Sequence, residues 1–217
     1  MRPTQTGERA AGVAGSVVAA LLLCGALLCI AVAGAGARHG RQWVTALFGR
    51  RVPGIIIHHT ATPAVVNGRR VDAAFLDEAH ARRGWSVTYE GRTYHIGYHY
   101  VILPDGTVQG GRPEAVHGAH TQRHNQYIGI CLVGNFSSSD NPLGRQWPSR
   151  PTDAQLKALV TLIRDVAGRY GLGPSDLYRH RDFAETACPG DRFPMEEVRQ
   201  RCNLAARGAR RPPSAGH

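Results

Sequence analysis

The sequence has almost no lysine. Lys157 is the only one, so arginine supplies nearly all of the 26 basic residues, which outnumber 16 acidic ones. The formal net charge of +10 favours an anionic partner, such as nucleic acid, a membrane surface or an acidic polymer. No base-reading motif accompanies the charge, so we expect no nucleic acid partner. A bias of genome composition toward arginine, alanine and glycine is the competing explanation.

Residues 10–37 lack any charged side chain, and this run exceeds the ~20 apolar residues that span a bilayer. Arg9 precedes the run and Arg38 follows it, so basic residues do not fix an orientation. The run ends in small residues of the kind that signal peptidase cleaves after. We therefore expect either a membrane anchor or a cleaved signal peptide. The protein is then exported, and it is either anchored facing the periplasm or cell wall, or secreted.

Composition divides the chain into four parts. Residues 1–37 form the signal peptide or signal anchor, and residues 38–52 form a basic linker. Residues 53–205 are the folded domain, of ordinary size for a single core. Residues 206–217 form a basic tail, rich in arginine, proline and glycine, that we expect to be disordered.

Strand and helix patterns alternate along the folded domain. An apolar run rich in isoleucine and a later apolar run are typical of strands buried on both faces. Pro104 and Gly106 predict a hairpin turn, with residues 107–109 pairing back. This order predicts an α/β or α+β domain in which helices flank a central mixed β-sheet. The predicted strands are 54–58, 98–103 and 127–133; the predicted helices are 72–83, 152–170 and 195–204; and residues 137–151 form a surface loop.

Two distant segments carry side chains that suit a zinc site. Residues 55–62 place His58 and His59 at the end of an apolar strand, and residues 180–190 contain a histidine and a cysteine. Neighbouring side chains on a strand face opposite ways, so His58 and His59 cannot both meet one metal. Three protein ligands leave the fourth position of tetrahedral zinc open, which indicates hydrolysis. The sequence has no His-Glu-x-x-His motif, which argues against a helix-based zinc protease.

Five motifs in one order resemble those of a known family. They lie at residues 55–62, 97–100, 118–120, 128–136 and 180–190. Together they resemble the zinc-dependent N-acetylmuramoyl-L-alanine amidases of the second amidase type. This group includes phage amidase-type lysozymes and the animal peptidoglycan recognition proteins. The resemblance covers residues 52–200, nearly the whole predicted domain.

The resemblance implies a fold, a cofactor and an activity. The fold is a single amidase or peptidoglycan-recognition-protein-like domain, the cofactor is Zn²⁺, and we expect a monomer. The implied activity is hydrolysis of the amide bond between N-acetylmuramic acid and L-alanine, with peptidoglycan or muropeptides as partners. Some relatives only bind, so a non-catalytic peptidoglycan-binding receptor is the alternative.

Carried over by motif position, the family's metal ligands fall on His58, His180 and Cys188. Tyr98 matches a tyrosine that stabilises the developing oxyanion. Thr186 occupies a position where phage members carry lysine and recognition proteins often carry threonine. A threonine hydroxyl can donate a hydrogen bond to an oxyanion but brings no positive charge.

Three further residues match the family's substrate groove. His120 either contacts substrate or supports the metal site, with a purely structural role as the alternative. Arg112 and Asn125 flank the groove by analogy and can bind the carboxylates and amides of a stem peptide. The motif positions do not single out a general base; the candidates are Glu90, Glu114 and Glu185.

An inserted segment departs from the family pattern, and the state of two cysteines is left open by the sequence. Residues 86–97 separate Gly84-Trp85 from Tyr98 and predict an inserted loop at the groove rim. Cys131 lies in an apolar strand pattern and is expected to be buried, and a Cys131–Cys202 disulfide is possible.

Overall fold

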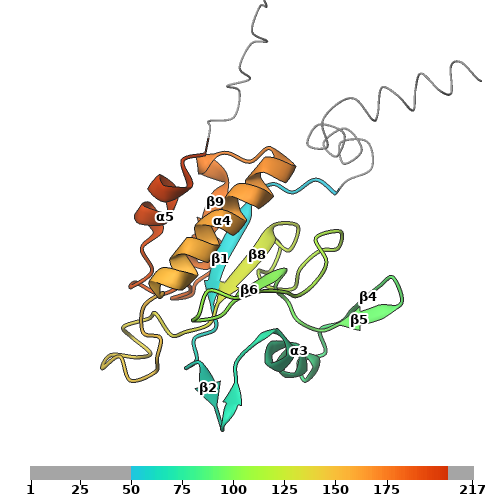
Figure 1. Ribbon diagram of the computed structural model, residues 1–217. Helices are drawn as coiled ribbons and strands as arrows, with labels where there is room; N and C mark the ends of the chain where they lie inside the picture. The colour runs from blue at the N-terminus through green and yellow to red at the C-terminus, as the bar shows by residue number, and fades with distance from the viewer. Residues whose placement is uncertain (1–49, 205–217) are drawn as a thin grey trace, which may run out of the picture. The chain divides into compact units, whose positions relative to one another are not determined.

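A five-stranded mixed sheet forms the centre of the structure, a computed structural model that describes residues 50–204 (Figure 1). The strand order is β7-β6-β8-β1-β9. All neighbouring pairs are parallel except β6 and β7, which form an antiparallel hairpin at one edge. This confirms the predicted mixed α/β architecture. The strands are β1 (Ile55–His59), β6 (Tyr100–Ile102), β7 (Val108–Gly110), β8 (Ile128–Leu132) and β9 (Leu177–Arg179).

The segments predicted at both ends of the chain lie outside the described residues. These are the signal or anchor at 1–37, most of the linker at 38–52 and the tail at 206–217. Within residues 50–204, no helix combines the length and apolar character that crossing a membrane requires.

The two central strands are buried on both faces, as their continuous apolar sequences predict. Every residue of β1 and of β8 is buried. Side chains alternate along each strand, so Ile55 and Ile57 of β1 enter the larger core together with Ile130 and Leu132 of β8. His58, which follows Ile57, and its register partner Cys131 on β8 face the opposite side of the sheet.

Helices cover the two faces unequally. The main core joins β1 and β8 to α4 (Asp153–Tyr170) and α5 (Met195–Cys202). A smaller apolar cluster on the other face joins β6 to α3 (Ala73–Ala81). The face that carries His58 is therefore covered mainly by loops, which leaves room for a site.

Helix α4 begins and ends with the capping residues that the sequence predicts. The Thr152 hydroxyl accepts a hydrogen bond from the Gln155 amide at 3.0 Å, and the Gln155 side chain accepts one from the Thr152 amide at 3.1 Å. This reciprocal pair is the predicted capping box. Gly171 ends the helix in the left-handed conformation, with φ of 65°.

Two short hairpins were missed by the sequence reading. Residues 86–97, predicted as an inserted loop, contain the antiparallel pair β4 (Val87–Tyr89) and β5 (Arg92–Tyr94). A second pair, β2 (Val65–Val66) and β3 (Arg69–Arg70), precedes α3. Each turn has two residues with positive φ, Asn67-Gly68 and Glu90-Gly91. This is the two-residue hairpin geometry, and Asn-Gly was its readable signal.

The cysteines of the domain are all free. Cys131 and Cys202 are buried and unlinked, so the possible disulfide between them is not formed. Cys131 is fully buried on β8, as its apolar surroundings predict.

Gln155 links α4 to the sheet, and its removal tests that link. Its side-chain amide donates to the carbonyls of Ile102 at 3.0 Å and Val133 at 2.9 Å, at the ends of β6 and β8. Gln155→Ala leaves the Val133 carbonyl without its donor, whereas the Ile102 carbonyl still accepts from the Val133 amide at 2.9 Å. We expect urea unfolding to show a loss of about 1–3 kcal/mol in the free energy of unfolding. The exposed Lys157→Ala on the same helix is the control, with a change within about 0.5 kcal/mol. Equal stability of the two variants would contradict the link.

Candidate metal centre

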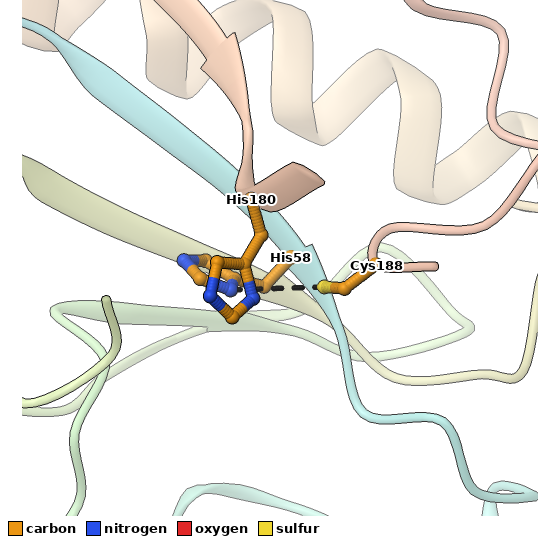
Figure 2. A group of neighbouring side chains, drawn as sticks. All are labelled: His58, His180 and Cys188. Carbon is orange, nitrogen blue, oxygen red and sulfur yellow. Dashed lines mark hydrogen bonds between the residues drawn. The ribbon is translucent and has the colours of Figure 1, made fainter. Parts of the chain in front are cut away.

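Three side chains converge at the carboxyl end of the sheet (Figure 2). His58 is the fourth residue of β1, His180 directly follows β9, and Cys188 lies on the loop beyond. One ligand atom from each lies within 4.8 Å of the others. Because β1 and β9 are adjacent parallel strands, their carboxyl ends bring His58 and His180 together, with ring centroids 4.6 Å apart.

Hydrogen bonds within the loop fix the position of Cys188. The Arg181 amide donates to the Cys188 carbonyl at 3.0 Å, which closes the loop between the histidine and the cysteine. The Cys188 amide donates to the Thr186 hydroxyl at 3.2 Å. The His59 amide donates to the Cys188 sulfur at 3.4 Å. The sulfur is thus held against the end of β1.

The donor set and its spacing fit a tetrahedral metal ion. His58 Nδ1 and Cys188 Sγ are 3.7 Å apart. A zinc ion with bonds of about 2.0 Å to nitrogen and about 2.3 Å to sulfur separates such atoms by about 3.5 Å. Two imidazoles and one thiolate are ligands that zinc prefers. Among residues 50–204, this is the one group of histidine, cysteine and acidic side chains spaced to hold a metal.

The protonation of the cluster also suits a metal. Burial is the main cause that holds the pKa of His58 well below 6.5, and the nearby His120 and His180 add to the effect. Burial likewise lowers the pKa of His180. Both imidazoles are therefore neutral near pH 7, as metal ligation requires. Burial raises the pKa of the Cys188 thiol to about 12, opposed by the His59 amide and the Arg181 charge. A bound cation would supply the charge that a buried thiolate needs.

His120 contacts the ring nitrogen of His58 that lies away from Cys188. Its Nδ1 lies 3.0 Å from His58 Nε2, and its Nε2 lies 3.2 Å from the Tyr127 carbonyl. The carbonyl can only accept, so His120 carries its proton on Nε2 and its Nδ1 accepts. Two donors face that Nδ1, His58 Nε2 and the Thr121 hydroxyl, each at 3.0 Å. With its proton on Nε2, His58 keeps its lone pair on Nδ1, the atom that faces Cys188. Such support commonly fixes the tautomer of metal-binding histidines.

Two glycines make the space for His120. A Cβ at Gly129 would lie 2.5 Å from the His120 ring, and one at Gly118 would lie 2.4 Å from it. No side chain at either position fits without displacing the ring, and Gly129 belongs to β8. The sheet itself therefore positions the residue that positions His58.

His59 faces away from the cluster, as strand alternation predicts. Its Nδ1 accepts a hydrogen bond from the Phe136 amide at 3.1 Å, and its ring packs 5.6 Å from that of Phe136. Only its backbone amide touches the metal cluster, through the Cys188 sulfur.

Comparison with known proteins agrees with this geometry. The family model described as N-acetylmuramoyl-L-alanine amidase matches residues 48–191. The chain belongs to this amidase family. The endolysin of Klebsiella phage KP32 is 32% identical over 136 residues, which are 62% of this chain and 78% of that relative. The match confirms the resemblance seen in the five sequence motifs.

Solved structures of amidases share the fold. LysC from Clostridium intestinale URNW, an N-acetylmuramoyl-L-alanine amidase, has 33% identity and a TM-score of 0.58, covering 71% of this chain and 87% of its own. A Drosophila PGRP-LB mutant in complex with tracheal cytotoxin has 27% identity and a TM-score of 0.51, covering 71% and 84%. The chain is therefore similar both to a bacterial amidase and to an animal PGRP.

In this amidase-family domain, Tyr98 lies beside the cluster and Thr186 at its rim. The Tyr98 ring centroid is 5.1 Å from that of His58. Burial raises the pKa of Tyr98 well above 10, with smaller contributions from Cys131 and Cys188, so the phenol stays protonated as a donor. Thr186 is exposed, and its oxygen accepts from the Cys188 amide, which leaves its hydroxyl hydrogen available.

The side chains of the other two residues expected at the groove bind the backbone of nearby segments. Arg112 is only 6% exposed and donates to the carbonyls of Ile96 at 2.6 Å and His117 at 3.2 Å. Asn125 instead shapes the loop that carries His120, because its side-chain oxygen accepts from the amides of His120 and Thr121. The structure brings neither residue into the metal cluster.

None of the candidate general bases joins the cluster. Glu114 accepts from Tyr100 at 2.6 Å, Tyr170 at 2.9 Å and Arg169 at 2.6 Å. Glu90 occupies the turn of the β4–β5 hairpin, and Glu185 is exposed on the ligand loop. Cys131, predicted only to be buried, is the β8 register partner of His58 and therefore faces the same side of the sheet. Alternation along β8 was the signal that could have placed it on the site's face.

The buried histidines predict acid sensitivity. Burial lowers the pKa of His80 to about 4 and of His99 to about 3, against 6.5 in the unfolded chain. Below pH 6.5 the unfolded state binds protons that the folded state does not. Stability is therefore complete above pH 6.5 and falls as the pH drops toward 4.

His80→Gln tests this dependence away from the ligands. His80 accepts from the Gly97 amide at 2.9 Å, which glutamine can also do. With a chelator present, we expect urea unfolding of the variant to lose less stability between pH 6 and pH 5, by up to about 1.4 kcal/mol. The exposed His117→Gln is the control and should follow the wild type. Identical pH slopes for all three proteins would refute the assignment.

Proposed function

We propose that the chain is a zinc-dependent hydrolase that cuts the amide bond between N-acetylmuramic acid and L-alanine in peptidoglycan. The observation that carries this proposal is the His58, His180 and Cys188 cluster, within a domain of the amidase family. Of the two predicted functions, the complete ligand set favours the enzyme over a non-catalytic receptor.

The proposed metal is held by His58 Nδ1, His180 and Cys188 Sγ. When bound there, zinc supplies an acidified water and a Lewis acid for the substrate carbonyl. Three protein ligands leave the fourth coordination position to water or substrate.

The chain's own residues orient the site and stabilise charge. His120 holds His58 in the correct tautomer, and the His59 amide supports the thiolate of Cys188. Tyr98, protonated across neutral pH, is the donor we assign to the oxyanion, with the Thr186 hydroxyl as a second. Both donors are neutral, so the oxyanion would be stabilised by hydrogen bonds from two hydroxyl groups and not by a lysine charge.

Peptidoglycan or its fragments are the proposed partner. The PGRP-LB relative was solved with tracheal cytotoxin bound, and the other relatives include phage endolysins. The proposed activity is directed at the cell wall. Export of residues 53–205 as a monomeric domain, through an anchor or cleaved signal at 1–37, remains our proposal from the sequence alone.

Digestion of purified peptidoglycan tests the activity and the metal together. We expect the full chain to release stem peptides that begin with L-alanine, identified by mass spectrometry. A chelator should abolish release, and added zinc should restore it. Cys188→Ser should lose both bound zinc and activity, whereas the exposed His117→Ala should keep both. Intact wall material carrying bound wild-type protein would instead favour the receptor.

His120→Ala tests whether the supporting histidine tunes the metal. Loss of the partner that orients a ligand commonly lowers metal affinity by about 10–100-fold. We expect that loss for zinc in competition with a chromophoric chelator, with His117→Ala as the matched control. Thermal unfolding of the metal-free variants checks that the fold is retained. Unchanged zinc affinity in a folded His120→Ala protein would show that zinc binding does not depend on the contact between His120 and His58.

A further inference from the structure

Large apolar side chains are exposed mainly at one end of the domain. Across residues 50–204, four such side chains are exposed, and three of them come from two neighbouring segments. Trp147 is 60% exposed and Leu143 is 71% exposed, both on the 137–151 loop; Val65, on β2, is 55% exposed. The Ala64 amide donates to the Trp147 carbonyl at 2.8 Å, which joins the two segments. Exposed apolar groups gathered in this way commonly mark an interaction site.

The backbone around Trp147 is held rigidly. The buried Asn141 side chain binds both sides of Gln146: its oxygen accepts from the amide at 3.1 Å, and its nitrogen donates to the carbonyl at 3.0 Å. The Pro148 carbonyl accepts from the Asn135 amide at 2.9 Å. The indole is therefore exposed on a fixed support, which lowers the entropy lost when it binds a partner.

This support is continuous with the metal centre. The 137–151 loop leaves β8 through Asn135 and Phe136, and the Phe136 amide binds the His59 ring. The Phe136 carbonyl accepts from Arg192, just beyond the ligand loop, at 3.0 Å. In Figure 1 the yellow-to-orange 137–151 loop and the β2–β3 hairpin extend from the same end of the sheet. The loop that carries Trp147 is therefore anchored to the segments that carry the candidate metal ligands.

The charge around Trp147 suits an anionic polymer. Arg145 and Arg150 are exposed on either side of it, and neither forms an ion pair with any residue in the 50–204 range. Peptidoglycan offers matching groups, because its stem peptides carry carboxylates and its pyranose rings present an apolar face of C–H groups. An indole binds such a face through burial of apolar area and through its negative π-surface.

We propose that Trp147 is a stacking platform for a pyranose ring of the glycan strand. Arg145 and Arg150 bind stem-peptide carboxylates of the same strand. This subsite rests on the proposed amidase function and makes the enzyme prefer polymer over single-sugar fragments.

The test compares polymeric peptidoglycan with a single-sugar N-acetylmuramoyl-peptide. For Trp147→Ala in the full chain, we expect kcat/KM to fall by about tenfold on the polymer and to stay within about twofold on the fragment. Trp147→Phe keeps an aromatic face and should retain most polymer activity. Val108→Ala, an exposed apolar truncation on the edge strand β7, is the control and should match the wild type.

The outcomes separate this inference from the proposed function. A wild type that cuts both substrates, with Trp147→Ala equal to it or equally impaired on both, would overturn the platform and leave the amidase intact. If the wild type cuts neither substrate, the amidase proposal fails, and co-sedimentation with insoluble peptidoglycan decides the platform. Weaker pelleting of Trp147→Ala supports it. Unchanged pelleting, or a loss confined to binding of anionic phospholipid vesicles, overturns it.

Discussion

The parallel pairing of β1 between β8 and β9 is the constraint on which the site depends. Ile55 of β1 pairs with Ile128 on one side and Leu177 on the other. That register sets His58 opposite Cys131 and places its ring beside that of His180, although the two histidines are 122 positions apart in the sequence. A slip of one residue would turn His58 into the apolar core and bring His59 to the site. The buried isoleucines that fix the register are thus as necessary to the ligands as the ligands' own chemistry.

The same burial that stabilises the sheet sets the charge state of the centre. Desolvation is the largest cause of both the lowered pKa of His58 and the raised pKa of the Cys188 thiol. The protein offsets only part of that cost, through one backbone amide and the nearby Arg181. A bound divalent cation would supply the opposing charge, so that metal binding and the ionisation of Cys188 would be coupled.

Much of the fold was predictable, and the features that were not share a cause. The long periodic helix α4 and the apolar strands follow from local patterns, and the candidate metal ligands, which the structure brings together, follow from motif order. The partners of Arg112 could not be predicted: its guanidinium donates to the Ile96 and His117 carbonyls. Which carbonyls need donors is decided by tertiary packing, and sequence does not show it. The tautomer of His58 was equally hidden, because it is set by a carbonyl at Tyr127, 69 residues away.

His120 fits in a narrow space between Gly118 and Gly129. A protein of this fold can therefore have all three candidate ligands and still lack the histidine position that orients His58. A relative could keep His58, His180 and Cys188 and still lose a correctly aimed imidazole through one added methyl group at position 129. Sorting enzymes from receptors in this fold by their ligands alone would then misclassify such a chain. The absence of a side chain at Gly129 is therefore a requirement of the site, although Gly129 is not itself a candidate ligand.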